Sequence, residues 1–259
     1  MQFGIQTYTL RNSMTTPEGF QDTLRRVAQM GYTNVQIRPP EFMSAEELAR
    51  MLKDFGLQAD SDFCGVYDIP EQLDQITASS RALGTDALRT DSIRNADRYS
   101  REGYESFAKH LNICGKALAE RGLRFMYHFH SFEFIKLGDT RGIDILLEQT
   151  QPEYVWFQPD VFWLAAAGTE PSESLKMFAG RAKYIHLKDY VIVSNESAVL
   201  EETKRASAPV GTGNLNWQGI FKTAKEIGIE NFVVEDDMGA MDPFESARIS
   251  IAYMKKLGF

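Results

Sequence analysis

The sequence has 259 residues, 43% of them apolar and 25% charged, with a formal net charge of −8 at pH 7. An acidic chain without a basic stripe is unlike a nucleic-acid-binding protein, so we expect no nucleic-acid partner. Two isolated cysteines, no secretory pattern at the N-terminus and no apolar run of the roughly 20 residues that cross a bilayer predict a cytoplasmic protein without a membrane partner.

Eight short runs read as strands, and each is followed by a stretch with helical periodicity. Because the runs are apolar almost throughout, both faces of each strand are expected to be buried, as in a parallel sheet covered by helices. A polar stretch at 194–214 is expected to be a loop. In chain order, the predicted strands lie at 3–8, 33–37, 57–63, 85–90, 123–130, 154–160, 182–190 and 231–237.

The helices between these strands carry start and stop residues. The first has Thr16 as its N-cap and Pro17 in its first turn, and Gly31 follows its end. Ser44 and Glu47 form a capping box for the second helix. Later helices are recognised by apolar faces: Tyr104, Phe107, Leu111, Cys114 and Leu118; Trp217, Phe221, Ala224 and Ile227; and Phe244, Ala247, Ile251 and Met254.

Eight strand–helix units in a chain of this length predict a (β/α)8 TIM barrel, with residues 1–259 as a single domain. An open doubly wound sheet is the alternative fold. That fold usually carries a glycine-rich phosphate turn after its first strand, and residues 8–11, Tyr-Thr-Leu-Arg, do not form one. In a TIM barrel the active residues lie at the C-terminal ends of the strands, so those positions are the place to look for chemistry.

The late strands end in side chains that could bind a divalent cation. Each has an ordinary structural explanation when taken alone: Asp160 could cap a helix, and Lys188 could extend into solvent. Together they favour a cation, because buried ionised carboxylates need a counter-charge. The residues are His128, His130 and Glu133 after the fifth strand, Asp160 after the sixth, His186, Lys188 and Asp189 after the seventh, and Glu235, Asp236 and Asp237 after the eighth.

Six motifs, in order along nearly the whole chain, resemble those of the sugar phosphate isomerase/epimerase family, the xylose isomerase-like TIM barrels. The motifs are "GIQTYTLR", "YHFHSFEF", "FQPDVFW", "HLKD", "PVGTGNLNW" and "VVEDD". Three positions depart from the usual pattern of the family. Phe129 stands where Asn is usual, Asp236 where Gln is usual, and Gln36 where the second strand usually ends in Glu, so the substrate stays open.

The resemblance implies one divalent metal ion held by Glu133, Asp160, His186 and Glu235. One histidine with three carboxylates is an oxygen-rich set, which predicts Mn²⁺ first and also allows Mg²⁺, Co²⁺ or Zn²⁺. His128 is the alternative to Glu133 as the ligand from strand five, because His128 lies on the strand whereas Glu133 lies in the following loop. We favour Glu133, since an ionised acid is also needed as a catalytic base.

The family's chemistry implies a metal-dependent isomerase or epimerase of a keto-sugar or related polyol, which moves a proton beside a carbonyl through an enediolate. Glu133 and Glu235 are the expected catalytic pair. Arg38 and Arg89, at early strand ends, could contact a hydroxyl, carboxylate or phosphate, or could equally form structural salt bridges. The residues expected to bind substrate are His128, His130, Lys188 and Arg38.

Alternatives to an isomerase remain. The same scaffold supports a dehydratase or lyase on a keto-inositol or 3-keto sugar, because those reactions begin with the same proton abstraction. A non-catalytic sugar-binding barrel need not hold a stoichiometric metal ion. An endonuclease IV-like nuclease would need a basic groove and more histidines than the four present. Formation of a homo-oligomer is left open by the sequence.

Overall fold

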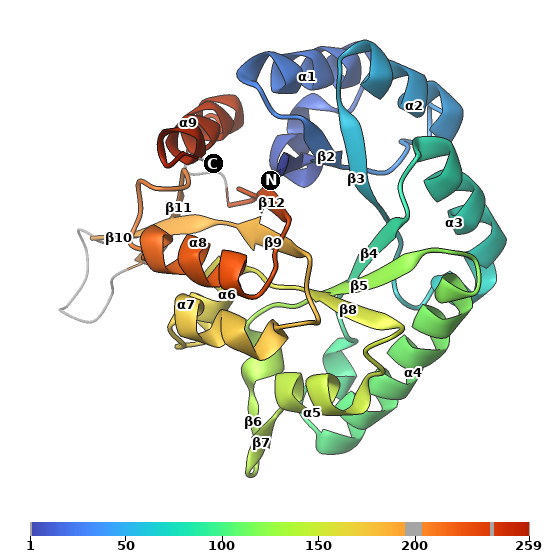
Figure 1. The fold of residues 1–259 in the computed structure, drawn as a ribbon, viewed down its shortest axis with the longest axis vertical. Coiled ribbons are helices and arrows are strands. Elements are labelled where there is room, and N and C mark those ends of the chain that lie inside the picture. The colour runs from blue at the N-terminus through green and yellow to red at the C-terminus, as the bar shows by residue number, and fades with distance from the viewer. Residues whose placement is uncertain (1, 195–203, 239–240, 259) are drawn as a thin grey trace.

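The computed structural model describes residues 2–194, 204–238 and 241–258. Eight parallel strands form one sheet in the order β8-β5-β4-β3-β2-β1-β12-β9, with helices around the outside (Figure 1). The prediction of a (β/α)8 TIM barrel is confirmed. The strands are β1 Gln2–Gln6, β2 Asn34–Gln36, β3 Gln58–Phe63, β4 Ala87–Asp91, β5 Arg124–His128, β8 Val155–Gln158, β9 Tyr184–Leu187 and β12 Asn231–Val234.

The barrel closes between the ends of β8 and β9. Asp160 and His186 form an isolated parallel bridge there, and the His186 N–H donates to the Pro159 carbonyl at 2.8 Å. Nearer the N-terminal ends of the same two strands, the Phe157 N–H donates to the Arg181 carbonyl at 2.8 Å. The closing contact therefore places two of the predicted metal ligands side by side.

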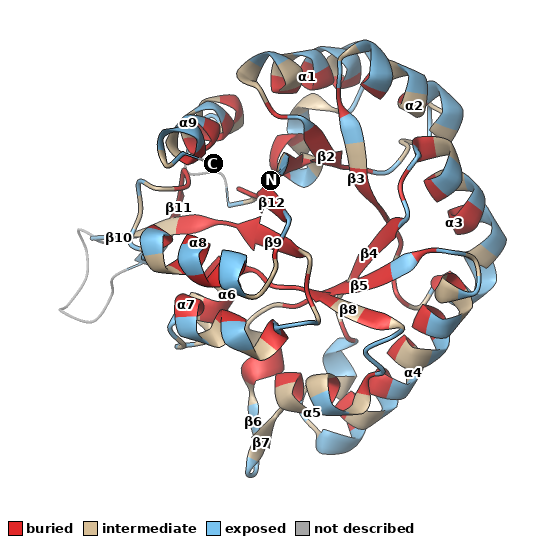
Figure 2. Cartoon of the chain, in the orientation of Figure 1, coloured by how far each residue is buried: buried red, intermediate tan, exposed pale blue. Residues whose placement is uncertain are grey.

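Helices cover the outer face of the barrel, and their inward sides are buried (Figure 2). Thr16 caps α1 by accepting the Gly19 N–H, and Ser44 and Glu47 form the predicted capping box of α2. Within the described residues, no helix combines the length and apolar character needed to cross a bilayer. The helices are α1 Pro17–Met30, α2 Ala45–Asp54, α3 Ile69–Leu83, α4 Arg101–Ala119, α5 Gly142–Gln149, α6 Val161–Ala166, α7 Pro171–Ser174, α8 Trp217–Glu226 and α9 Pro243–Lys256.

The inside of the barrel is layered. A small apolar cluster fills the part of the interior nearer the N-terminal ends of the strands. It consists of Ala87, Met126, Tyr184 and Val233. Alternate residues of a strand point to the same face, so the next inward position on each strand is two residues further on. Those positions hold polar side chains: Arg89, His128, His186 and Glu235. The alternation along the strands therefore places a polar layer directly above an apolar floor.

Three segments differ from the sequence prediction. The first strand ends at Gln6 because the Gln6 side chain accepts the Tyr8 N–H at 3.2 Å, which starts a 3-10 helix over Thr7–Ser13. The stretch at 194–214 lies partly outside the described residues, and its described part is not only loop. β11 Lys204–Ala208 lies in that stretch, and it pairs with the preceding β10 Asp189–Val193 as an antiparallel hairpin. A shorter hairpin joins β6 Lys136–Leu137 and β7 Thr140–Arg141.

Asp189 anchors the base of the β10–β11 hairpin. Its carboxylate is fully buried and accepts hydrogen bonds from the backbone N–H groups of Gly211 and Gly213, at 3.0 and 2.9 Å. The same oxygen accepts a hydrogen bond from the Trp217 indole N–H at 2.6 Å. Trp217 is buried, as predicted for the apolar face of its helix. Asp189 is thus a structural residue that ties the end of β9 to the start of α8.

Candidate metal centre and cavity

Four side chains of metal-binding type converge at the C-terminal end of the barrel. One ligand atom from each of His128, Asp160, His186 and Glu235 lies within 4.8 Å of the others. They come from the ends of β5, β8, β9 and β12, and each is at most 8% exposed. Two carboxylates buried this deeply need positive charge nearby. The group is therefore a candidate site for a divalent cation.

The two carboxylate oxygens of Asp160 have different neighbours. Its Oδ1 accepts the N–H groups of Phe162 and Trp163, at 2.8 and 3.2 Å, and so caps α6. Its Oδ2 lies 3.5 Å from His128 Nε2 and 3.9 Å from His186 Nδ1. Burial raises the pKa of Asp160 to about 6, against the lowering effect of the Lys188 charge. Asp160 is therefore the N-cap of α6, as its structural explanation predicted. Its Oδ2 is left directed at His128 and His186.

The His186 ring is oriented by a pair of buried glutamines. Its Nε2 lies 2.7 Å from Gln36 Oε1. An amide oxygen only accepts hydrogen bonds, so Nε2 carries a proton, and Nδ1 is the ring atom that faces Asp160 and Glu235. The Gln36 amide is held in turn by reciprocal hydrogen bonds with Gln158, at 3.2 and 3.3 Å. Partners of this kind fix the tautomer and angle of a metal-binding histidine.

Several buried atoms of the group have no hydrogen-bond partner. They include Nδ1 of His128, Nδ1 of His186 and Oε2 of Glu235. The last two atoms are only 2.9 Å apart. Two atoms of this kind come this close only when a cation lies between them, and either a proton or a metal ion can fill that role. Burial lowers the pKa of His128 well below its usual range, which keeps that ring in the neutral form that binds metals. The residues present therefore fit a divalent metal ion.

We expect Gln36→Leu to weaken metal binding about 10- to 100-fold, the usual scale when a partner of a metal-binding histidine is removed. Gln36→Glu should restore most of the affinity, because a carboxylate can still accept the His186 Nε2 hydrogen. The dissociation constant can be measured by competition with a chelator. Equal affinity of Gln36→Leu and wild type would show that the glutamine does not orient the ring.

Glu133 lies outside this group. β5 ends at His128, and a 3-10 turn over Phe132–Phe134 then carries Glu133 back toward the outer face of the strand. There its fully buried carboxylate accepts hydrogen bonds from the Tyr127 hydroxyl and, at 2.9 Å, from the His130 N–H. Burial raises the pKa of Glu133 to about 8. The geometry supports His128, the alternative to Glu133, as the fourth member of the group.

Lys188 lies beside the group of candidate metal ligands. Lys188 is 1% exposed, so it does not extend into solvent. It pairs with Asp237 and lies 4.9 Å from the ring centroids of both Phe162 and Trp163. Burial lowers the pKa of Lys188, but Asp160, Glu235 and Asp237 together raise it above its usual value. The amine is therefore a buried positive charge.

A cavity of about 990 Å³ opens over the candidate metal centre. One part of its wall holds His128, His130, Trp163 and Glu235, and another holds residues from the early strands. The His130 ring stacks on Phe132 with centroids 5.0 Å apart, and its buried Nδ1 has no partner. Neither Glu133 nor Lys188 lines this cavity. The early-strand residues that line it include Gln6, Gln36, Arg38, Ser61, Phe63, Arg89 and Asp91.

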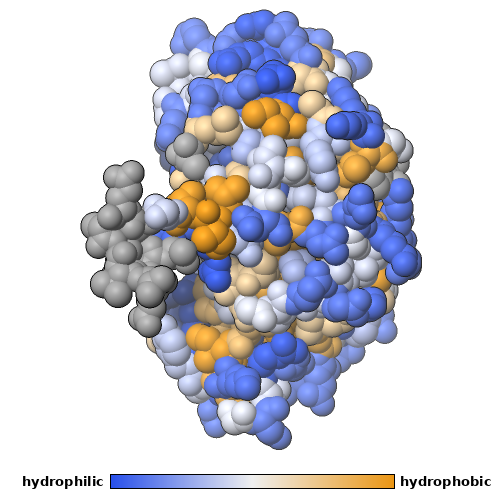
Figure 3. All heavy atoms as spheres, turned by 90° about the vertical axis from the view of Figure 1, so that its left-hand side faces the viewer, coloured by the Kyte–Doolittle hydropathy of each residue, from blue (hydrophilic) through white to orange (hydrophobic). Residues whose placement is uncertain are grey.

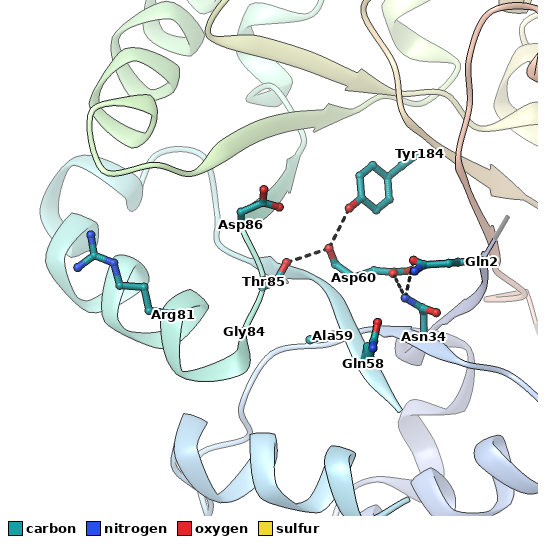
Figure 4. A pocket seen from close by; sticks show the side chains of 10 residues that line it. All are labelled: Gln2, Asn34, Gln58, Ala59, Asp60, Arg81, Gly84, Thr85, Asp86 and Tyr184. Carbon is teal, nitrogen blue, oxygen red and sulfur yellow. Dashed lines mark hydrogen bonds between the residues drawn. The ribbon is translucent and has the colours of Figure 1, made fainter. Parts of the chain in front are cut away.

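A second cavity, of about 470 Å³, lies at the opposite end of the barrel (Figure 4). Its lining includes Asn34, Asp60 and Tyr184, which are near the N-terminal ends of their strands. The Asp60 carboxyl accepts a hydrogen bond from Asn34 at 2.6 Å. Residues at the N-terminal end of a TIM barrel stabilise the fold, whereas the active site lies at the C-terminal end. The larger cavity is therefore the candidate active site.

Residues 24–257 match the family model described as a xylose isomerase-like TIM barrel. The chain belongs to the xylose isomerase-like TIM barrel family. Its curated relatives include an inosose dehydratase of Clostridium botulinum (strain Alaska E43 / Type E3). The two are 30% identical over 168 residues, which is 61% of this chain and 56% of the dehydratase. The chain thus spans about half the length of the curated relatives it matches.

Solved structures of similar fold cover almost the whole barrel. A sugar phosphate isomerase/epimerase from Parabacteroides distasonis has a TM-score of 0.80 and 23% identity, over 98% of this chain and 93% of its own. An IOLI protein with a bound zinc atom has a TM-score of 0.73 and 15% identity, over 99% and 98%. A xylose isomerase-like TIM barrel protein from Mycobacterium smegmatis, in complex with magnesium, has a TM-score of 0.71 and 15% identity, over 99% and 96%.

The sequence analysis missed Gln158 and gave no role to Gln36 beyond its departure from the family pattern. Strand alternation would have found both. Gln36 lies two residues after Asn34, and Gln158 lies two residues before Asp160 on the inward side of β8. Inward polar residues next to a candidate ligand are the places where orienting partners of a metal site are expected.

Proposed function

We propose that this chain is a divalent-metal-dependent enzyme that isomerises or epimerises a keto-sugar or related polyol by moving a proton beside the carbonyl. Residues 1–259 form one domain in this proposal. The observation that carries it is the buried group of His128, Asp160, His186 and Glu235, which faces a cavity large enough for a small sugar. Membership in the xylose isomerase-like family supports it.

The donor set of the proposed site is two imidazoles and two carboxylates. Exchanging Glu133 for His128 makes the site richer in nitrogen than the sequence predicted. Imidazole ligands suit Zn²⁺ and Fe²⁺, whereas sites made only of oxygen suit Mg²⁺. The two imidazoles favour Zn²⁺ over the Mn²⁺ expected from the sequence and over Mg²⁺ as the resident ion. The IOLI protein carries zinc, and the Mycobacterium smegmatis protein carries magnesium.

The bound metal ion would polarise a substrate carbonyl and stabilise negative charge on its oxygen. Glu235 lines the cavity and is the base that takes the proton from the adjacent carbon. His130, whose Nδ1 has no partner, hydrogen-bonds a substrate oxygen. Lys188 acts through Asp237, which it holds at the cavity wall. Glu133 fixes the backbone at His130 and does not reach the substrate.

A dehydratase is the second candidate function, because the matched curated relatives include inosose dehydratases at 26–30% identity. Removal of water from a keto-inositol starts with the same proton abstraction. The two reactions then diverge, since elimination expels a hydroxide whereas isomerisation returns the proton. Incubation with keto-inositols and ketoses separates them, because only elimination gives a product that is lighter by one water.

Metal content tests the proposed ligand set. We expect His128→Gln to lower metal affinity at least tenfold, because it removes one of four ligands. Glu133→Gln should retain a full complement of metal, because the Glu133 carboxylate is bound to Tyr127 and His130. Elemental analysis of both variants, purified without chelator, gives the answer. Loss of metal in Glu133→Gln with retention in His128→Gln would reverse the assignment.

A further inference from the structure

Two arginines from early strands line the active-site cavity with unused hydrogen-bonding capacity. Arg89 is only 9% exposed, and its buried Nε has no hydrogen-bond partner. Its Nη1 lies 3.3 Å from Asp91 Oδ2, which is a long ion pair. Arg38 is exposed to the cavity, and no described carboxylate lies within 4.0 Å of its guanidinium. These two positive charges are therefore only partly balanced by the protein.

One aromatic ring supports both guanidinium groups. The Arg89 guanidinium carbon lies 4.7 Å from the Phe63 ring centroid, and that of Arg38 lies 6.0 Å from the same centroid. Stacking on a ring restrains an arginine while leaving its N–H groups free to bind other partners. Phe63 lines the same cavity. The Phe63 ring is therefore a shared neighbour of two positively charged groups, on a part of the wall that follows β2, β3 and β4.

Structural salt bridges do not account for this arrangement. Arg38 has no such bridge among the described residues, and Arg89 uses one of its five donors at a long distance. A second unpartnered polar atom, the buried Oγ of Ser61, lines the same cavity. Free donors on a buried guanidinium are costly unless an acceptor reaches them. The bidentate geometry of arginine matches a carboxylate or a phosphate.

We propose that the substrate carries an anionic group, a carboxylate or phosphate, which Arg38 and Arg89 bind while the metal centre holds the reacting carbonyl. This inference rests on the proposed function, because it names the substrate class of the same site. It makes the preferred substrate an acidic sugar. A neutral ketose or inositol offers hydroxyl oxygens that accept hydrogen bonds but brings no negative charge to balance the two arginines.

Equilibrium binding to the metal-loaded protein tests this proposal. Three matched six-carbon probes are titrated calorimetrically at low ionic strength: D-glucitol, D-gluconate and D-glucitol 6-phosphate. We expect at least one anionic probe to bind roughly tenfold or more tightly than glucitol, the scale of a charge-assisted hydrogen bond. Comparison of the carboxylate with the phosphate identifies which anion the arginines accept.

Arginine variants show where the anion binds. Arg38→Gln and Arg89→Gln should each reduce the preference for the anion several-fold while metal content stays unchanged. Arg94→Gln is the matched control, because Arg94 also stacks on an aromatic ring, 4.0 Å from the Tyr67 centroid, but does not line the cavity. Since Arg38 is exposed, Arg38→Gln provides the test even if Arg89→Gln fails to fold.

Two results overturn the proposal. One is the absence of any preference for either anion in the wild-type protein, including no measurable anion binding. The other is a preference that persists unchanged in both variants, which would place the anion on the metal ion. Neither result depends on turnover. Deuterium exchange from solvent into a neutral ketose reports separately on the proposed reaction, so failure of the anion site and failure of the proposed function are distinguishable.

Discussion

Glu235→Gln is expected to lower turnover about 10²- to 10⁴-fold, the usual contribution of one general base. The amide keeps the shape of the side chain but cannot accept the proton. Glu235 is buried, lines the cavity and lies 2.9 Å from the His186 imidazole. Burial raises its pKa, but the neighbouring His186, His128 and Lys188 hold that pKa well below its usual range. The side chain is therefore an ionised carboxylate at neutral pH.

The measurement is incorporation of solvent deuterium beside the carbonyl in a panel of ketoses, keto-inositols and acidic keto-sugars. Metal content is determined on the same samples, because Glu235 also belongs to the proposed ligand set. Glu230→Gln is a suitable control, since Glu230 is exposed at the opposite end of β12 and pairs with Lys183. Conversion by the wild type without label, or full activity of metal-loaded Glu235→Gln, would exclude the enediolate route.

Asp60→Asn is expected to stabilise the protein at pH 8 by up to about 4 kcal/mol, since each unit of raised pKa costs the ionised wild type about 1.4 kcal/mol. The Asp60 carboxyl is 5% exposed, has no counter-charge within 4.0 Å among the described residues, and leaves Oδ2 without a partner. The Asp60 side chain has room inside the barrel because the residue opposite, on β1, is Gly4. A Cβ atom at Gly4 would lie 2.6 Å from Oδ2 of Asp60. Burial raises its pKa to about 7, against the lowering effect of the Asn34 hydrogen bond. An amide avoids the cost of ionising this group.

The effect should depend on pH in a defined direction. The unfolded chain releases the Asp60 proton near pH 4, whereas the folded protein retains it until about pH 7. The wild type therefore loses stability as pH rises between these values, by about 1.4 kcal/mol per pKa unit. Above pH 7 the loss is complete, and below pH 4 it is absent.

Denaturant unfolding of both proteins at pH 4 and pH 8, with metal content held equal, checks this pH dependence. Asp86→Asn is the control, because Asp86 lines the same cavity but is exposed and pairs with Arg124. Its replacement should change stability by less than about 1 kcal/mol. An Asp60→Asn variant that is no more stable than the wild type at pH 8 would show that the buried carboxyl is balanced in another way.

The fold could be predicted from sequence because local rules and the global pattern agree. Thr16 and Ser44 mark helix starts, and the apolar face of α4 is buried as its periodicity indicated. The β10–β11 hairpin was missed because its second strand, Lys204–Ala208, is short and polar. Backbone hydrogen bonds in such an exposed ribbon do not require an apolar pattern. A space-filling view of this side shows hydrophobic residues gathered in a few patches among hydrophilic ones (Figure 3).

The candidate site was only partly predictable. Strand ends brought Asp160, His186 and Glu235 together because adjacent parallel strands end at one rim. The choice between His128 and Glu133 could not be made from sequence, because it depends on where β5 stops. The turn at Phe132–Phe134 directs Glu133 to Tyr127 and leaves His128 in the buried group. Turn geometry of this kind is set by tertiary contacts that no local pattern encodes.

The anchoring role of Asp189 has a consequence for how this protein can vary. Its buried carboxylate binds Gly211, Gly213 and Trp217, so the base of the β10–β11 hairpin is held by bonds that do not involve the outer part of the hairpin. Changes in the length of the outer part of the hairpin should therefore leave the position of His186 unaltered. Loop-closure entropy rises only slowly with length, which makes such changes inexpensive. The outer part of the hairpin offers protein engineers a place to insert a peptide tag without disturbing His186.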